Sequence, residues 1–349
     1  MFVCLSSGYR PRYRRDIARS LALPAGTALQ FRYGQEWILP AITARLGERK
    51  ARKKLRGTPV LIAYADQADE SKEIDVVPCR YATLVDAAVL GRTVSLQLQT
   101  NNFAHAPDLA AFNDELRSRA PTLARRSGTG IEGHYWVELN ELADVQSSGE
   151  IGFWEATVSQ IAARRDFATE RFFYVVDGIA DVAKDEVLRA RKNTFNVRPG
   201  RDYDLRLYHY HPTEGDPDAE VGLTAMGAPV AFTMTPEALL DSRYDLKRIR
   251  FRTGSPVPAQ RGVLTLRRRR LGSDAWEWDF DIGVRVRAAV LRQLFFGLVV
   301  AAFLAVTPIV AAYSNPKLSS REQLIIAVVG GASSLLAGIT AAFGLRRSL

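Results

Sequence analysis

The sequence contains few of the side chains from which redox, metal and nucleophilic sites are built. Its 349 residues include two cysteines, Cys4 and Cys79, and four histidines. Two cysteines exclude a disulfide framework, and no CxxC or Cys/His spacing typical of a zinc site occurs. Walker A, GxSxG, HExxH and protein-kinase motifs are absent as well. We therefore expect no cofactor, no bound metal and no catalytic residue, and the sequence predicts a protein that is not an enzyme.

The N-terminus lacks the order of features found in a secretory signal peptide. Only a few apolar residues precede the basic run at 10–15, whereas a signal peptide places a long apolar stretch between its charges and a cleavage site. This order favours a cytoplasmic location for the first 288 residues.

Long uncharged runs are missing from those 288 residues, but two follow them. They lie at 294–313 and 324–345, and the polar segment 314–323 joins them. About 20 apolar residues are enough for a helix to cross the hydrocarbon core of a bilayer. We therefore expect residues 289–349 to form a two-helix transmembrane hairpin.

The charges that flank this predicted hairpin set its orientation. Arg285, Arg287 and Arg292 precede the first run, and Arg346 and Arg347 follow the second. Because basic residues concentrate on the cytoplasmic side of a membrane, we expect a multi-pass inner-membrane protein with both termini in the cytoplasm.

Small residues recur every four positions within both runs. Such spacing lets helix backbones approach closely, which favours association in lipid. The two stripes either close the hairpin on itself or join protomers, and we expect a homo-oligomer. The stripe residues are Gly297, Ala301 and Ala305 in the first run and Gly330, Ser334, Gly338 and Ala342 in the second.

The rest of the chain is typical of a mainly β protein with some α-helix. Apolar and polar residues alternate strictly at 276–287, which is the period of a half-buried strand. Further strand patterns at 203–211, 230–234, 244–253 and 263–267 are separated by turn residues, so 193–288 is predicted to be an Ig-like antiparallel β-sandwich.

Two further regions precede the predicted sandwich. Residues 1–125 are expected to form a β-rich α+β domain, and residues 126–192 a mixed α/β segment that packs with it or stands alone. The predicted strands of the first region are 28–33, 60–65, 74–84 and 93–100, and its predicted helix is 107–119.

Basic residues outnumber acidic ones, with a net charge of +9. The stretch 243–270 is especially basic and precedes the predicted anchor, so we expect it to lie near membrane lipid, with nucleic acid as the less favoured partner and a solvated surface as the alternative. The predicted anionic-lipid patch comprises Arg267, Arg268, Arg269, Arg270, Arg285, Arg287 and Arg292.

Three weaker sequence patterns are better explained by local structure than by a binding site. The GxGxxG at 128–133 lacks the preceding strand and following helix of a dinucleotide site. His209 and His211 precede an acidic segment, but two prolines favour a strand end with a solvated turn over a metal site. The acidic segment 66–75 is likewise predicted to be a solvated loop.

The leading functional hypothesis is a non-enzymatic membrane effector. Its cytosolic β-rich region would sense a ligand, either a small molecule or a protein partner, and its hairpin would oligomerise and perturb or permeabilise the membrane. In outline this architecture resembles prokaryotic stress or antiviral-defence membrane effectors. Two alternatives stay open, a passive scaffold that recruits a cytosolic partner and a membrane-bound enzyme with an unrecognised site.

Overall fold

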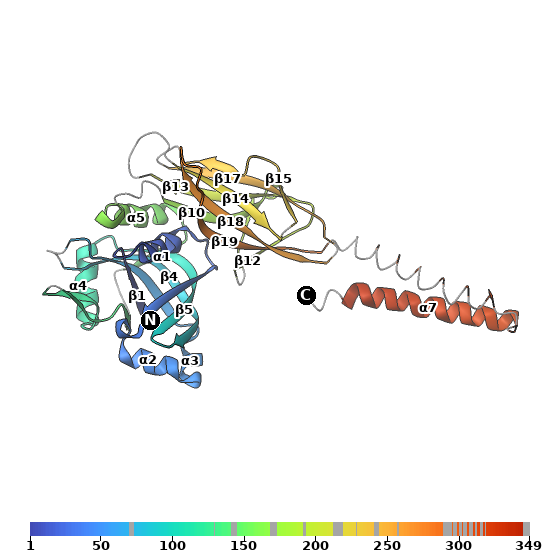
Figure 1. Cartoon of the computed structure of the whole chain (residues 1–349), viewed down its shortest axis with the longest axis horizontal. Coiled ribbons are helices and arrows are strands. Elements are labelled where there is room, and N and C mark those ends of the chain that lie inside the picture. The colour runs from blue at the N-terminus through green and yellow to red at the C-terminus, as the bar shows by residue number, and fades with distance from the viewer. Residues whose placement is uncertain are drawn as a thin grey trace.

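The chain folds into an N-terminal α/β unit, a β-sandwich and a separate C-terminal helix (Figure 1). The computed structural model describes residues 1–69, 73–128, 130–140, 145–167, 173–190, 193–211, 219–227, 229–240, 244–256, 258–288 and 319–344, with single positions between 295 and 317. Of residues 244, 277–279 and 334–344 it describes the backbone alone.

The N-terminal unit is built on a seven-stranded sheet in the order β2-β5-β4-β3-β1-β8, with β9 paired to β5. β1 and β3 are parallel neighbours, and the other pairs are antiparallel. The strands are β1 (Phe2–Ser7), β2 (Ala28–Gly34), β3 (Pro59–Asp66), β4 (Asp75–Leu90), β5 (Thr93–His105), β8 (Trp136–Glu138) and β9 (Gln146–Ser148). The four strands predicted within residues 1–125 are confirmed, each with longer or shifted ends.

Helices cover both faces of this sheet. Phe2 and Cys4 of β1 belong to one buried cluster and Val3 and Leu5 to another, because successive side chains of a strand point to opposite faces. Helices α1 (Pro11–Ala22), α2 (Pro40–Gly47), α3 (Arg49–Leu55) and α5 (Ile151–Ala162) contribute to the first cluster, and α4 (Leu109–Arg119) contributes to the second.

The β-sandwich consists of two five-stranded sheets, ordered β11-β10-β13-β17-β15 and β12-β19-β18-β14-β16. Across the sandwich, the Tyr174 and Phe280 rings lie 6.2 Å apart. The strands are β10 (Phe173–Asp181), β11 (Glu186–Leu188), β12 (Thr194–Val197), β13 (Asp202–Tyr210), β14 (Ala219–Met226), β15 (Val230–Phe232), β16 (Glu237–Leu239), β17 (Tyr244–Thr253), β18 (Gln260–Arg270) and β19 (Glu277–Val286). The prediction of a mainly β protein with a β-sandwich is confirmed.

The sandwich extends further toward the N-terminus than the predicted range 193–288. β10 pairs with β13 along its whole length, so this part of the predicted segment 126–192 belongs to the sandwich. β12 instead crosses to the other sheet and runs parallel to β19. Among the six long strands, this order places the first, second and fourth (β10, β13 and β17) on one sheet and the third, fifth and sixth (β14, β18 and β19) on the other. With β15 counted beside β17, this is the strand arrangement of immunoglobulin-type sandwiches.

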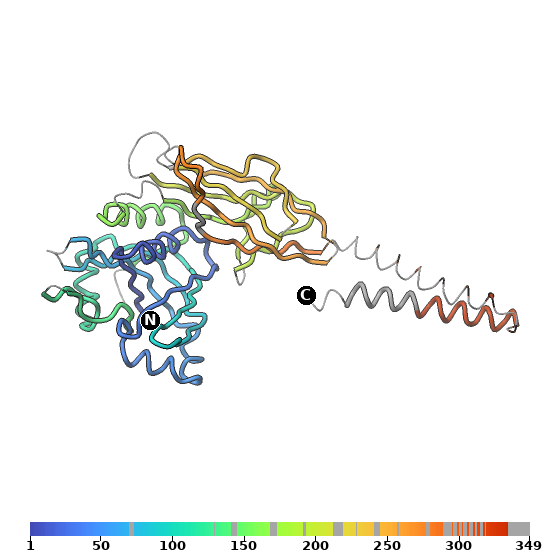
Figure 2. Tube along the Cα trace, in the orientation of Figure 1, coloured from blue at the N-terminus to red at the C-terminus, as the bar shows by residue number. Residues whose placement is uncertain are grey.

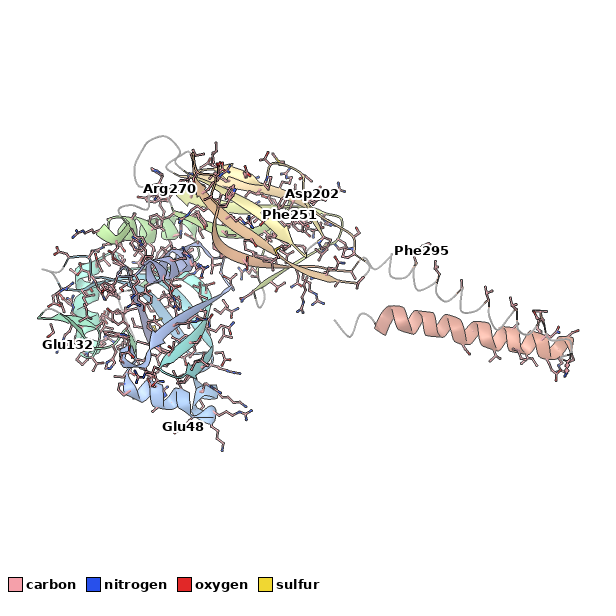
Figure 3. All side chains as sticks on the ribbon, viewed as in Figure 1. Glu48, Glu132, Asp202, Phe251, Arg270 and Phe295 are labelled. Atoms are coloured by element: carbon pink, nitrogen blue, oxygen red, sulfur yellow. The ribbon has the colours of Figure 1, made fainter. Side chains whose placement is uncertain are left out.

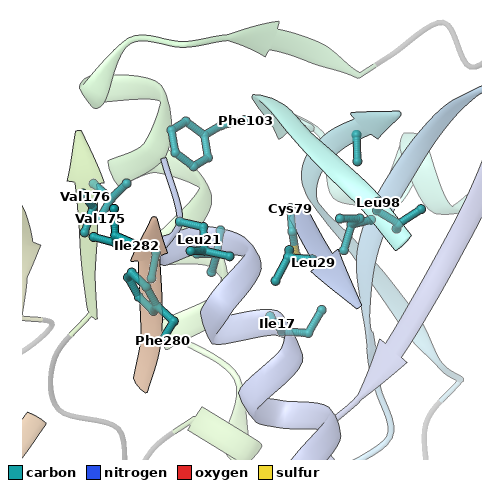
Figure 4. Close-up of a cluster of buried hydrophobic side chains, with 14 of the residues drawn as sticks. Ile17, Leu21, Leu29, Cys79, Leu98, Phe103, Val175, Val176, Phe280 and Ile282 are labelled. Carbon is teal, nitrogen blue, oxygen red and sulfur yellow. The ribbon is translucent and has the colours of Figure 1, made fainter. Parts of the chain in front are cut away.

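One continuous hydrophobic cluster joins the N-terminal unit to the sandwich (Figure 4). Ile17 and Leu21 of α1 lie between the N-terminal sheet and the sandwich, and Val176 of β10 and Phe280 of β19 lie on the sandwich side. All four are at most 4 % exposed. The tube in Figure 2 shows the two units side by side along this contact.

The C-terminal helix α7 (Ser320–Gly344) lies beyond the end of the sandwich at which β19 finishes (Figure 1). Taking only residues that the structure describes, no helix is both long enough and apolar enough to cross a membrane. Most of the first predicted span, 294–313, lies outside the described residues, and so do the side chains of the second span from 334 onward.

Asp16 on α1 gives the fold a pH dependence that can be measured. Burial raises its pKa to about 6 from 3.8, although Arg12 and neighbouring arginines oppose the shift. The folded state therefore binds the proton more tightly than the unfolded state, and stability falls as the pH rises from about 4 to 6. We expect Asp16→Asn to stabilise the chain by about 1–2 kcal/mol at pH 7.5 and to have little effect at pH 4.

The test compares melting temperatures of the wild type and Asp16→Asn between pH 4 and pH 8. Asp114→Asn on α4 is the matched control, because the Asp114 side chain is 84 % exposed. A stabilisation by Asp16→Asn that is equal at both ends of the pH range would contradict the prediction.

Candidate functional site

The carboxyl ends of β1 and β3 are the place in this fold where a ligand site is expected. The two strands are parallel, with Ser6 opposite Tyr64 and Ser7 opposite Ala65. In open α/β sheets, ligands bind in the crevice beyond the carboxyl ends of parallel strands. Gly8 and Tyr9 follow β1 there, and the Tyr9 side chain is 77 % exposed.

Several polar side chains lie close together near the carboxyl ends of β1 and β3, around the short helix η2 (Arg165–Phe167). The Tyr64 hydroxyl donates a hydrogen bond of 2.6 Å to Asp166 Oδ2. Arg14 Nη1 donates to the Asp166 backbone carbonyl at 2.8 Å. We call these residues, together with Asp66, Arg164 and Phe167, the Asp166 cluster.

Electrostatics fix the protonation of the central tyrosine. Burial, reinforced by the hydrogen bond to Asp166, raises the pKa of Tyr64 well above its ordinary range. Tyr64 therefore remains a hydrogen-bond donor throughout the physiological pH range and does not act as a base. The cluster therefore holds β3 and η2 together through a protonated tyrosine and a carboxylate acceptor.

Arg164, the residue before η2, forms ion pairs with two strands of the N-terminal sheet. Its Nη1 lies 3.4 Å from Asp66 Oδ2 and 3.3 Å from Asp75 Oδ2. These two carboxylates belong to the acidic segment predicted to be a solvated loop, so that prediction is wrong at both of its ends. The reason is tertiary, since Arg164 lies about ninety residues further along the chain.

Phe167 connects the Asp166 cluster to the sandwich. Its side chain is fully buried, and its ring lies 5.2 Å from the Tyr64 ring and 6.0 Å from the Phe173 ring. Phe173 is the first residue of β10. An aromatic chain thus runs from the carboxyl end of β3, through η2, into the sandwich.

Gly8 is required by the close approach of Asp166. A Cβ atom at position 8 would lie 1.7 Å from Asp166 Oδ2, so Gly8→Ala must displace the carboxylate that accepts the Tyr64 hydrogen bond. We expect Gly8→Ala to cost about 1–3 kcal/mol, the usual penalty for a buried polar group left without its partner. The measurement is the free energy of unfolding from urea titration.

A double-mutant cycle makes this prediction specific. In an Asp166→Gly background the obstructing side chain is gone, and Gly8→Ala should cost much less than in the wild type. Equal costs in the two backgrounds would show that Gly8 does not act through Asp166.

The structure separates the residues of the predicted anionic-lipid patch. Arg285 and Arg287 lie at the end of β19, opposite the start of β18, whereas Arg267, Arg268, Arg269 and Arg270 lie at the other end of β18. At a rise of about 3.3 Å per residue, roughly 30 Å separates the two groups. Figure 3 shows Arg270 and Asp202 at opposite ends of the sandwich. Arg292 lies outside the described residues.

Arg269, at the far end of β18, has local partners. Arg269 pairs with Glu220 and lies over the Trp276 ring, 4.4 Å from its centroid. These four arginines therefore lie at the opposite end of the sandwich from Val286, where β19 ends. The antiparallel reversal between β18 and β19 explains why nearness in sequence misled the prediction.

The remaining candidate residues are placed as follows. Gly330 lies in α7, as do the backbones of Ser334, Gly338 and Ala342, whereas Gly297, Ala301 and Ala305 are outside the described residues. His209 and His211 are buried, and the acidic residues between 212 and 218 are outside the described residues. Within the described part of the chain, no group of three metal-binding side chains occurs.

The GxGxxG segment forms a small two-stranded hairpin of β6 (Arg125–Ser127) and β7 (Gly130–Glu132). Gly128 and Gly133 adopt positive φ angles of 55° and 92°. A Cβ atom at position 133 would lie 2.7 Å from the Leu123 carbonyl oxygen, so this glycine serves the turn. The next described element is the strand β8, so the segment does not open a helix.

The sequence interpretation missed the Asp166 cluster entirely. Arg14, Tyr64 and Asp166 are far apart along the chain and share no motif. The one available signal was Ser6-Ser7-Gly8 after an apolar run, which is typical of a strand that ends in a close-approach loop.

Comparisons with known proteins do not identify a family for this chain. No protein-family model and no curated protein matches the chain. Among solved structures, the PapD-like domain 7 of human CEP192 is 10 % identical over 28 % of this chain and 82 % of its own, with a TM-score of 0.21.

Two further solved structures are similar at the same level. The CooA pilin subunit of enterotoxigenic Escherichia coli is 6 % identical over 32 % of this chain and 97 % of its own, with a TM-score of 0.21. WR4, a C. elegans MSP family member, is 9 % identical over 28 % and 93 %, with a TM-score of 0.18. Structural similarity at such TM-scores does not support a conclusion about function.

Proposed function

We propose that this chain is a non-enzymatic, membrane-anchored effector of the inner membrane. The N-terminal unit receives a ligand or protein signal at the carboxyl ends of β1 and β3. The sandwich relays it, and the hairpin of residues 289–349 oligomerises and perturbs the bilayer. Both termini lie in the cytoplasm.

The observation that carries this proposal is the aromatic chain from Tyr64 through Phe167 to Phe173. A ligand that favours a different position of η2 acts directly on the first strand of the sandwich, and ligands shift equilibria through such differential contacts. The last strand, β19, ends at Val286, eight residues before the apolar run at 294–313. The input edge and the anchor are therefore linked through one packed body.

The small-residue stripe of the second span supports oligomerisation. Lipid tails are as apolar as the helices, so close backbone packing has to supply the energy of association. Gly330, Ser334, Gly338 and Ala342 recur every four residues along one side of α7. Ala332 lies on a different side by the 100° rotation per residue, which gives a matched control on the same helix.

The test expresses the full chain in bacterial cells and records membrane potential with a potential-sensitive dye. Wild-type expression is expected to depolarise the cells, and Gly330→Ile and Gly338→Ile to reduce the depolarisation several-fold at equal expression. Ala332→Ile is expected to behave as the wild type. Cross-linking in the membrane checks that the two glycine variants have lost the oligomer.

The opposite result selects the scaffold alternative. If wild-type expression leaves the membrane potential unchanged while the chain is inserted and oligomeric, the anchor only holds a cytosolic partner at the bilayer. An unchanged response in both glycine variants would remove the role assigned to the stripe.

A further inference from the structure

A polar cavity of about 330 Å³ lies at the end of the sandwich from which the chain continues toward residues 294–313. Five strands border it, since β10, β12 and β19 end there, β13 begins there, and β11 contributes Glu186 and Leu188. Its lining combines Lys184, Arg189, Arg198 and Arg287 with Tyr203 and a few other residues.

The four basic side chains of the cavity are available to a ligand. Within the part of the chain that the structure describes, none of them forms an ion pair. Two carboxylates, Asp181 and Glu186, also line the cavity. Asp181 is occupied, because it lies 3.5 Å from Arg201 Nη1 and accepts a hydrogen bond from the Ala183 N–H. The lining therefore carries an excess of uncompensated positive charge.

Tyr203 adds a buried donor to this lining. Its side chain is 1 % exposed, and its hydroxyl accepts a hydrogen bond of 2.8 Å from the Arg198 N–H. Burial raises the pKa of Tyr203, so the hydroxyl keeps its proton. Among the described residues that proton has no acceptor. A buried donor without an acceptor is costly unless a ligand or water supplies one.

We propose that this cavity binds a phosphate ester, supplied either by the headgroup of an anionic phospholipid or by a soluble phosphomonoester. Guanidinium groups match phosphate oxygens in paired, charge-assisted hydrogen bonds. The Tyr203 hydroxyl donates to the same group of oxygens. The volume is at the lower end of the range for small-molecule sites, which suits a headgroup or a compact ester.

The position of the cavity favours the lipid source. Arg287 lines the cavity and is followed by only six residues before position 294. A chain of that length reaches at most about 25 Å, so the cavity faces the bilayer surface if the anchor inserts at 294. This choice of source rests on the proposed membrane anchoring, whereas the phosphate chemistry rests on the cavity alone.

The experiment uses the full chain purified in a neutral detergent. Calorimetric titration with glycerol 3-phosphate tests the soluble source, and mixed micelles containing phosphatidylglycerol, against phosphatidylcholine alone, test the lipid source. Arg198→Gln is expected to weaken binding about tenfold through the loss of a charge-assisted contact. Tyr203→Phe is expected to weaken it about threefold to tenfold without any change in charge.

Arg261→Gln is the matched control. Arg261 is exposed at the same end of the sandwich, opposite Arg285, but does not line the cavity. Its removal should leave the affinity within about twofold of the wild type, since distant surface charges are largely screened by salt. Circular dichroism and melting temperature verify that each variant is folded.

Each outcome decides the proposal. Binding of glycerol 3-phosphate alone supports the site with a soluble ligand, and selective binding of phosphatidylglycerol micelles supports it with a headgroup. No binding of either probe overturns it. An equal loss of affinity in Arg261→Gln and Arg198→Gln also overturns the proposal, because the general positive charge of this end of the sandwich would then explain the binding. None of these results depends on depolarisation of cells, so this proposal and the effector function fail separately.

Discussion

Phe167→Ala is expected to destabilise the chain by about 3–5 kcal/mol, the usual cost of truncating a fully buried phenylalanine. It is also expected to split thermal unfolding into two transitions. Phe167 packs against Tyr64 on one side and Phe173 on the other, so its loss weakens the contact between two units that each have their own sheet. Differential scanning calorimetry reports the number of transitions, and limited proteolysis reports exposure of the connection around η2.

Phe112→Ala is the control for this experiment. Phe112 is equally buried, but it belongs to α4 and packs in the cluster on the opposite face of the N-terminal sheet. Its removal should lower stability by a similar amount without freeing the sandwich. A single transition in Phe167→Ala, or a split transition in Phe112→Ala, would mean that η2 is not what couples the two units.

A second large effect is expected at Arg80, an arginine that is 1 % exposed in the interior of the N-terminal unit. It donates to the Ser20 and Leu23 carbonyls at the C-terminal end of α1, and to the Asn101 carbonyl at 2.9 Å. Its guanidinium lies 4.3 Å from the centroid of the Phe103 ring. Burial lowers the pKa of Arg80 to about 9, so the group remains charged at neutral pH.

Arg80→Met is expected to cost about 3–5 kcal/mol, because each buried carbonyl left without a donor costs about 1–3 kcal/mol. The carbonyls at the end of α1 have no donor within the helix, which makes this arginine the cap of that helix. The free energy of unfolding measures the loss. Arg32→Met on β2 is the control, because Arg32 is exposed in the same sheet. A loss below about 1 kcal/mol in Arg80→Met would show that water replaces the arginine.

The strands that the sequence predicted correctly are those with local signals. The alternation at 276–287 gave β19 almost to the residue, and 244–253 coincides with β17. β1 was missed because both of its faces are covered, so its residues form a short apolar run without alternation. α1 was missed because its four arginines obscure the apolar face formed by Ile17 and Leu21.

The candidate sites could not be predicted because they depend on long-range pairing. Tyr64 meets Asp166 across 102 positions of sequence. The cavity in the sandwich gathers Lys184, Tyr203 and Arg287 only because β10, β13 and β19 end or begin together. Which end of the sandwich a charged residue occupies is set by strand direction, and composition alone does not encode it.

The parallel pairing of β12 with β19 determines how the sandwich bears mechanical load. A force applied to the chain beyond Val286 pulls on β19, which is bonded to β12 through Val197 and to β18 along nearly its whole length. Inter-strand hydrogen bonds run across the strand direction. Such a pull therefore shears many bonds at once and does not open them one after another. Residues 289–349 therefore follow a strand that resists such a pull with many hydrogen bonds at once.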